Sequence, residues 1–454
     1  MLTAARAGRP APIGRRSLRA PWFLAALPAL ALCPGAARAD NVEEFGLTPR
    51  AQAMGNAYTA LASDASAAHY NPGGLTLSHH VNITFAWSFA DYALRFDSAS
   101  GAQDGDAERI PDLSAFTLGV STTIPLDVPD RLGFGLALFL PTRGIVDLEA
   151  KAPTSEPEWF RYGERHDRVH VIVSAGVKVT DWLRAGLGAS VFTDGEGGTV
   201  ISAGLATPVQ PEYKLQLKPD AGVVAGVLLL PTEWLSLGLT YRSEVSFKLD
   251  FPAVASVQGV NLPLTLEAIS LFTPHQLQLG AAVNFGPRVL VTFDFLWAHW
   301  SAYEDPHLVV TSGVVAVPNR VREDLNDVFS PRFGLEVVAT DWLALRGGYY
   351  FRNAIVDDQD GLTNLVDTHK HVFTVGLGFT FGQPSDPVTV EPQEEARAEN
   401  WAQLTKDASL DLDLFFQLHW HQGRSQSKPP GDPVGDWDAD GFIVNFGVGI
   451  TARF

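Results

Sequence analysis

The last fifteen residues of the 454-residue chain, Asp440–Phe454, read DGFIVNFGVGITARF. Every second position from Phe442 carries Phe, Val, Phe, Val, Ile, Ala and finally Phe454, whereas the positions between carry Ile, Asn, Gly, Gly, Thr and Arg. Successive side chains of a β-strand point to opposite faces. The segment therefore predicts a strand with one face in an apolar medium and the other against polar groups or water.

The same alternation recurs through most of the chain. From Leu410 the even positions are Leu, Leu, Leu, Phe, Leu and Trp, while the odd ones include Asp411, Asp413, Gln417 and His419. We count fourteen such segments: 80–97, 113–125, 131–144, 168–180, 183–200, 219–231, 235–251, 275–286, 289–305, 331–340, 343–358, 369–382, 409–423 and 440–454. Most are long enough to cross hydrocarbon as tilted strands, which takes ~9–11 residues.

The connections between these segments alternate between short and long. Three short ones share a motif, Thr-Asp/Glu-Trp-Leu, which begins at Thr180, Thr232 and Thr340. Short turns at one end and long loops at the other are typical of outer-membrane barrels, and Trp residues gather at their membrane interfaces. One expected short turn, 383–408, is instead long and acidic, and we interpret it as a periplasmic insertion. A soluble β-sandwich is the alternative, but it explains neither the small-residue inward faces nor the terminal Phe.

The first 39 residues predict a cleaved signal peptide, with an Arg-rich start, an apolar core and Ala37-Arg38-Ala39 before the cleavage point. The Arg15-Arg16 pair leaves a twin-arginine route open. Cys33, the single cysteine, would leave with this segment. The remaining chain has 27 basic and 51 acidic residues, a formal charge of −24, which argues against nucleic acid as a partner.

The segment Phe45–Leu75 (FGLTPRAQAMGNAYTALASDASAAHYNPGGL) differs from the strands because it is rich in Ala, Gly, Ser and Asn. Thr48-Pro49 is a helix start, and a second short helix is expected to open near Asp64 and to end at Asn71-Pro72-Gly73-Gly74. Small residues bury too little apolar area to form a core alone. We therefore expect residues 40–78, the hatch, to plug the lumen of a barrel formed by residues 79–454.

Two sets of residues are candidate ligand contacts. Alternation places several charges on inward faces, and three of the arginines, Arg332, Arg346 and Arg352, come from neighbouring strands and could bind a carboxylate. Pairing with luminal acids is the alternative for each. Loop 252–274 is unusually apolar for an external loop and is a candidate capture site; its candidate residues are Leu262, Leu264, Leu266, Ile269 and Phe272.

Histidines at two places raise a catalytic and a metal-binding interpretation. His299 and Ser301 lie two apart on an outward face, as in a barrel lipase, but the sequence offers no third group or oxyanion hole. His369 and His371 have outward parity whereas His419 and His421 have inward parity, so register keeps the two pairs apart and no metal site is expected. The sequence predicts neither an enzyme nor a cofactor.

The hatch segment resembles the N-terminal region of the FadL/TodX family of outer-membrane hydrophobic-compound transporters. The matching residues include Arg50, Gly55, Asp64, Asn71 and Pro72, and Gly73-Gly74 stands where the family usually has Ala-Gly. The resemblance implies a 14-stranded antiparallel transmembrane β-barrel with a helical hatch in the lumen. It also implies capture of fatty acids or aromatic hydrocarbons at external loops, and lateral release through the wall at a kinked third strand.

Physical chemistry explains the need for such a route, since each buried CH₂ is worth about 0.8 kcal/mol and a long acyl chain resists entering water. In the third segment, Gly133, Gly135 and Pro141 are positions where strand pairing could weaken, because Pro lacks a donor and Gly lacks a side chain. We expect a monomer in the outer membrane of a Gram-negative bacterium, surrounded by outer-membrane lipid and lipopolysaccharide. Its terminal Phe454 is expected to contact the barrel-assembly machinery.

Overall fold

The fold is described from a computed structural model that places residues 40–98, 110–124, 131–143, 158–163, 167–200, 212–257, 260–303, 309–311, 324–359, 365–382, 408–432 and 435–454. The predicted signal peptide and nearly all of the predicted insertion 383–408 lie outside these residues. No helix in the described part of the chain is long and apolar enough to cross a membrane.

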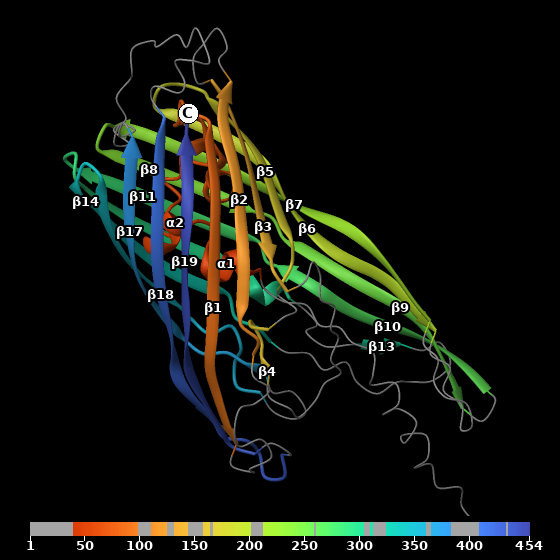
Figure 1. Cartoon of the computed structure of the whole chain (residues 1–454). Coiled ribbons are helices and arrows are strands. Elements are labelled where there is room, and N and C mark those ends of the chain that lie inside the picture. Colours follow the sequence, from red (N-terminus) through yellow and green to blue (C-terminus); the bar gives the residue numbers. More distant parts are fainter. Residues whose placement is uncertain are drawn as a thin grey trace, which may run out of the picture.

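Fourteen strands form a closed barrel, in the order β1-β19-β18-β17-β15-β14-β12-β11-β8-β7-β6-β5-β3-β2 (Figure 1). All neighbours pair antiparallel, and β1 closes the ring against β19 over the full length of both strands. The strands are β1 Asn82–Ser98, β2 Leu113–Ile124, β3 Leu132–Pro141, β5 His170–Lys178, β6 Leu183–Val200, β7 Glu212–Thr232, β8 Leu235–Arg242, β11 Gln276–Phe285, β12 Val289–Ala298, β14 Val328–Thr340, β15 Leu343–Arg352, β17 Lys370–Gly382, β18 Ser409–Gln426 and β19 Trp437–Arg453.

The burial of side chains follows the predicted alternation. On β19 the odd positions, such as Ile443 and Asn445, are buried, whereas Phe442 and Phe446 on the even positions are exposed on the outer surface. Such an outer surface is stable only against lipid, because so many exposed aromatic and aliphatic side chains would be costly in water. The three motif tryptophans Trp182, Trp234 and Trp342 lie at short turns and are 54–55% exposed.

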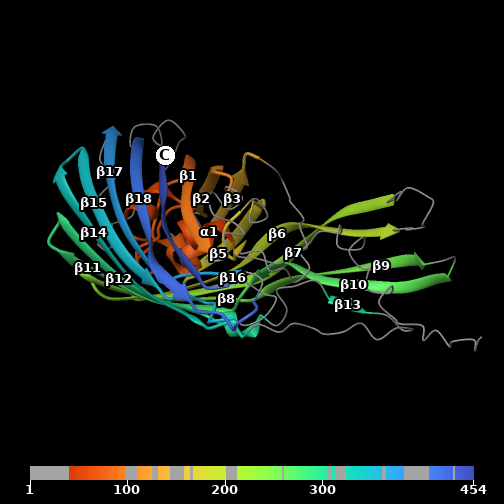
Figure 2. The same cartoon turned by 90° about the horizontal axis from the view of Figure 1, so that it is seen from below.

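Two predicted segments differ in kind from the structure, and two others, 289–305 and 343–358, end earlier than predicted, at Ala298 and Arg352. The segment 235–251 is not one strand, because β8 ends at Arg242 and the Ser243 side chain then accepts the backbone N–H of Val223 in place of a ladder partner. The segment 252–274 is not a loop. It belongs to the hairpin β9 Val245–Val257 and β10 Val260–Thr273, which β13 Val309–Thr311 extends to three strands. Apolar residues at alternate positions of 260–266 already carried a strand pattern. This hairpin and the ends of β6 and β7 project beyond the barrel (Figure 2).

Inside the ring lie four short helical turns, α1 Asn41–Phe45, α2 Pro49–Ala53, α3 Ala67–Tyr70 and the 3₁₀ turn η2 Pro72–Thr76. Strands enclose them on all sides (Figures 1 and 2). Thr48 precedes α2 and Asn71 follows α3, as the sequence predicted. Nearly all residues of 40–76 are buried, so the hatch fills the lumen and shares one core with the barrel wall.

Candidate transport site

The hatch lies against a barrel wall that has no side chains at the points of closest contact. A Cβ on Gly348 of β15 would lie 2.4 Å from the backbone nitrogen of Gly55, and Gly55 itself has φ +62°. On the opposite side of the lumen a Cβ on Gly133 would lie 2.3 Å from the carbonyl oxygen of Leu75. Inward-facing glycines therefore let the hatch backbone touch the wall, and a larger residue at these positions would force the two apart.

The Asn71-Pro72-Gly73-Gly74 turn is held by the Asn71 side chain. Its amide nitrogen donates to the carbonyls of Thr59 in the hatch (2.9 Å) and Val227 on β7 (3.0 Å), and its amide oxygen accepts the N–H of Gly73. A Cβ on Gly74 would lie 1.9 Å from the Ala62 carbonyl oxygen. Asp64, the acidic residue of the motif, accepts the N–H and hydroxyl of Ser66 before α3. The motif residues thus fix the hatch to itself and to the wall.

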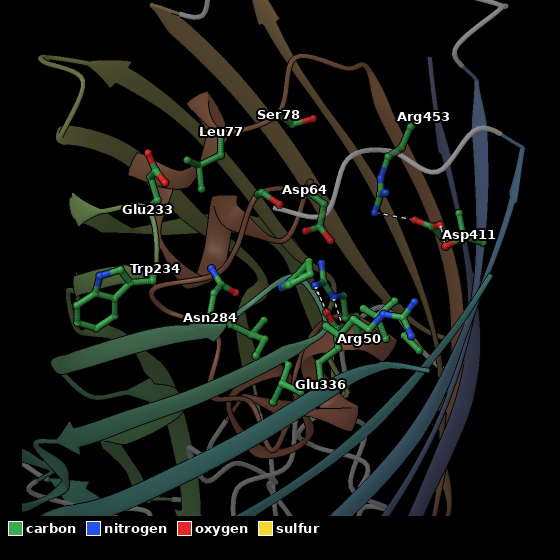
Figure 3. A pocket seen from close by; sticks show the side chains of 18 of the residues that line it. Arg50, Asp64, Leu77, Ser78, Glu233, Trp234, Asn284, Glu336, Asp411 and Arg453 are labelled. Carbon is green, nitrogen blue, oxygen red and sulfur yellow. Dashed lines mark hydrogen bonds and ion pairs between the residues drawn. The ribbon is translucent and has the colours of Figure 1, made fainter. Parts of the chain in front are cut away.

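Ion pairs attach the hatch to the wall on the side of the short turns. Arg50 of α2 donates twice to Glu336 of β14, at 2.9 and 2.7 Å, and Arg346 of β15 donates to the same carboxylate at 2.6 Å (Figure 3). Arg346 also pairs with Asp413 of β18. A single carboxylate thus joins a hatch arginine to a wall arginine.

This ion-pair network borders a cavity of about 1150 Å³ between the hatch and the rim of short turns. Figure 3 shows Asp64, Leu77 and Ser78 of the hatch side facing Glu233, Trp234 and Asn284 across it. Charges of both signs line the cavity, including Lys178, Asp411 and Arg453. Such charges favour water and make the cavity less favourable for an acyl chain than a purely apolar wall. This end of the lumen is therefore a wet vestibule.

On the other side of the hatch, residues 158–163 from the connection between β3 and β5 enter the lumen and cover α1. Arg161 lies 2.9 Å from Glu43 and 3.1 Å from Glu44, and the Tyr162 hydroxyl donates to Glu44 at 2.9 Å. The two-residue strand β4, Glu158–Trp159, pairs in parallel with β16, Leu365–Val366. We call residues 158–163 the strap.

Glu44 is the buried carboxylate at the centre of this contact, and Lys370 of β17 also pairs with it. Burial opposes its ionisation, but Lys370, Arg161 and Arg352 outweigh burial and hold the pKa of Glu44 well below its usual range. Because its pKa is lowered, Glu44 of α1 remains a carboxylate, and it joins the hatch, the strap and the wall.

The lumen next to the strap has one apolar side. Tyr92 and Phe96 of β1, Leu113 of β2, Phe139 of β3 and Ile443 of β19 all face inward and belong to the core cluster that includes Phe45 of α1. This apolar wall ends where the barrel pairing is interrupted. The β3–β5 ladder runs from Leu132 to Phe139 and has no further pair among the described residues, although β3 continues to pair with β2 as far as Pro141.

The three predicted arginines do not form one cluster. Arg346 pairs with Glu336 and Asp413, and Arg352 pairs with Asp367 at 2.8 Å, so luminal acids occupy both. Arg332 differs from them. It is 7% exposed, its guanidinium lies 5.3 Å from the Tyr350 ring centre, and no described carboxylate lies within ion-pair distance of it.

The other predicted contacts lie apart from these arginines. Leu262, Leu264, Leu266 and Ile269 are on β10, where the structure describes the backbone alone. Phe272 is buried and stacks on Tyr303, with ring centres 4.6 Å apart, beside Trp300. Gly133 and Gly135 lie inside an unbroken ladder and make room for Leu75; that they weaken pairing stays a prediction. Only Pro141 lies beyond the ladder's end.

The His299 and Ser301 pair does not have triad geometry. The Ser301 hydroxyl donates to Asp327 at 2.7 Å, and no hydrogen bond joins His299 to Ser301 among the described residues. His299 instead stacks on Trp297. The histidines on β17 and β18 face opposite sides, with His419 and His421 fully buried inside. Within the described part of the chain no group of His, Cys, Asp and Glu has metal-binding geometry.

Sequence reasoning missed the most connected residues of the lumen. The pairing of Glu44 with Arg161 could not be predicted from the sequence, because neither residue lies on an alternating strand and the two are far apart in the chain. Glu336 shares the inward parity of Arg332, and Asp413 lies on the polar face of its strand, but which arginine each one meets depends on hatch position and strand register.

Comparison with known proteins agrees with this architecture. Residues 31–387 match the family model described as outer membrane protein transport protein (OMPP1/FadL/TodX). The chain belongs to the FadL/TodX family of outer-membrane transport proteins. FadL/TodX members are outer-membrane transporters of hydrophobic compounds, and this chain is accordingly an outer-membrane β-barrel transporter of that class.

Solved structures of similar fold share little sequence with the chain. A FadL homologue from Pseudomonas aeruginosa has a TM-score of 0.56 and 14% identity, covering 93% of this chain and 99% of its own. The P. putida toluene transporter TodX gives 0.53 and 14%, with 90% and 99% covered. The Ralstonia pickettii toluene transporter TbuX gives 0.50 and 15%, with the same coverage. No curated protein sequence matches the chain.

Proposed function

We propose that this FadL/TodX-family barrel takes up long-chain fatty acids by capture on its external side and lateral release through the wall beside β3. The observation that carries the proposal is the apolar wall formed by Tyr92, Phe96, Leu113, Phe139 and Ile443, which ends beside the last pair of the β3–β5 ladder. A hydrophobic ligand on this wall would reach lipid without entering the charged vestibule below the hatch. The water-filled route is unfavourable because each exposed CH₂ costs about 0.8 kcal/mol.

The end of the ladder provides the place to test release. If the β3–β5 register continued, Leu140 would face Val169, whose carbonyl accepts the backbone N–H of Thr193 on the opposite, β6 edge of β5. Closing this gap with a disulfide is possible because the chain has no cysteine after Cys33. The variant Leu140→Cys/Val169→Cys is expected to lose uptake of labelled oleate under oxidation and to regain it on reduction.

The matched control places the same bridge within the intact ladder, as Leu136→Cys/Val173→Cys, since these residues already pair. Its uptake should not change on oxidation. Full uptake by the oxidised 140–169 variant, with the disulfide confirmed by mass spectrometry, would rule out release at this site.

Arg332 favours a carboxylate as the ligand's head. It is a buried cation with no described carboxylate within ion-pair distance, although Asp294 lies opposite it in the β12–β14 register, and it lies above a tyrosine whose hydroxyl donates to the backbone carbonyl of Glu44 in the hatch. A buried guanidinium is strongly stabilised by a hydrogen-bonded carboxylate. We infer that the fatty-acid carboxylate binds Arg332 next to α1.

Aromatic-hydrocarbon uptake is the second candidate, because two of the similar structures are toluene transporters and aromatic rings line the apolar wall. Arg332→Gln separates the candidates. It should reduce oleate uptake roughly tenfold, since hydrogen bonds to charged groups are worth about 1.5–3 kcal/mol, and it should leave toluene uptake unchanged. Arg332→Lys should keep part of the oleate uptake. Toluene uptake with no oleate uptake in the unmodified protein would favour the hydrocarbon.

A further inference from the structure

The outer surface of the barrel carries histidines at the end away from the short turns, a feature that transport through the lumen does not use. His275, His299, His369 and His371 are four of the chain's twelve histidines, and all four have outward parity at the external ends of β11, β12 and β17. Aromatic rings lie between them. In an outer-membrane barrel this level is where lipid headgroups meet the wall.

The rings around His371 form a continuous stack on β15, β17 and β18. His371 lies 5.4 Å from Trp420 at 29°, and 6.2 Å from Tyr349 at 30°. Phe351 contacts both His371 and His369. The two imidazoles are therefore held in position by neighbouring rings and are not free to rotate.

Hydrogen bonds determine which nitrogen of each imidazole carries its proton. Nδ1 of His369 accepts the backbone N–H of Ala354 at 3.0 Å, and a backbone N–H can only donate. Nδ1 of His371 lies 2.9 Å from the Tyr349 hydroxyl, which is the natural donor of that pair. The proton of each neutral ring is thus on Nε2. Among the described residues neither Nε2–H has a hydrogen-bond acceptor.

His275 lies on the same outer surface but, unlike His369 and His371 in the described part of the chain, has a carboxylate within ion-pair distance. Its Nδ1 also accepts a backbone N–H, from Glu244 at 3.2 Å, but its Nε2 lies 3.9 Å from the Glu244 carboxylate. An anionic ligand at His275 would meet that carboxylate. His369 is exposed and His371 half-buried, with no carboxylate in ion-pair distance of either among the described residues.

We propose that His369, His371 and Trp420 form a binding site for the phosphate group of outer-leaflet lipid, the phosphorylated lipid A of lipopolysaccharide. Two adjacent N–H donors fit the oxygens of one phosphate. Below them on the same outward face lie Phe373 and Val375, 48% and 58% exposed, against which acyl chains can pack. Trp420, 50% exposed, lies level with His371 on the neighbouring strand β18. The proposal rests on the outer-membrane location and not on the transported ligand.

The test compares lipid A with its enzymatically dephosphorylated form, each added to the purified barrel in detergent and counted by native mass spectrometry. The unmodified protein should bind the phosphorylated form at least about tenfold more tightly, the factor expected when even one of the two hydrogen bonds to the charged acceptor forms. His369→Phe/His371→Phe keeps the ring stack and removes both donors, so it should lose this preference. His275→Phe is the matched control and should keep it.

Two further measurements separate the loss of the donors from misfolding and from simple anion binding. His369→Gln/His371→Gln restores side-chain N–H groups and should recover part of the preference, whereas a general loss of folding would not be rescued; heat-dependent gel mobility checks that each barrel is closed. Inorganic phosphate at millimolar concentration should not displace lipid A, because it lacks acyl chains. Equal binding of the two lipids by the unmodified protein, or displacement by inorganic phosphate, would overturn the assignment.

Discussion

Glu336 is the residue on which the lower attachment of the hatch depends. It receives Arg50 and Arg346 together and is 7% exposed, so replacing it with Gln leaves two cations facing each other. Breaking a buried ion pair costs about 3–5 kcal/mol, and we expect Glu336→Gln to weaken hatch docking by about 3 kcal/mol because the adjacent vestibule admits water. The fully buried Ala53, changed to Cys, reports docking through its rate of reaction with a thiol reagent.

Arg95 and Asp440 supply the comparison for this prediction. They form an ion pair at 2.8 Å on the surface, with side chains 72% and 45% exposed. Exposed pairs contribute little, so Arg95→Gln should leave the reaction rate of the Ala53→Cys reporter unchanged. Equal rates in the Glu336→Gln and Arg95→Gln backgrounds would show that the luminal pair does not hold the hatch.

At the level of single residues, the sequence predicted which face of the barrel a side chain points to, but not which residue it contacts. Period-2 alternation placed Arg332, Arg346 and Arg352 on the inward face correctly, since parity follows from local backbone geometry. It could not show that Arg346 meets Glu336 and Asp413 while Arg332 meets a tyrosine ring. Those contacts depend on the register of neighbouring strands and on which hatch residue occupies the lumen.

At the level of elements, the fourteen barrel strands were predictable because each must keep one face apolar against lipid. The prediction failed where a strand leaves the barrel. Beyond Arg242 the chain continues to alternate into β9, so the pattern shows no boundary, and the break comes from side-chain bonds made by Ser243 and His275. The strap 158–163 was also missed, because a short luminal segment has no periodicity.

At the level of the whole molecule, the hatch is held between two differently built contacts. Below it, Arg50 borders a wet, charged vestibule, whereas above it Glu44 is fully enclosed by the strap and wall. Opening the lumen from the external side therefore requires the strap and Glu44 to separate. The strap follows β3 in the chain, before β5, so the proposed exit beside β3 and the cover over the hatch belong to one stretch of sequence.

This arrangement predicts how hatch docking responds to pH. In the docked state the charges of Lys370, Arg161 and Arg352 hold the pKa of Glu44 below its usual value of about 4.3, so docking is favoured wherever Glu44 is ionised in both states. That contribution is complete above about pH 5 and is lost as the pH falls through the lowered pKa. Hydrogen exchange of hatch amides, after correction for intrinsic rates, should therefore rise below about pH 5 through Glu44, separately from any response of the buried His419 and His421 at higher pH. Glu44→Gln, which leaves Lys370 and Arg161 without this charge, should exchange faster at neutral pH and respond less to acid. An acid response below about pH 5 that is as large in Glu44→Gln as in the unmodified protein would contradict the central role assigned to Glu44.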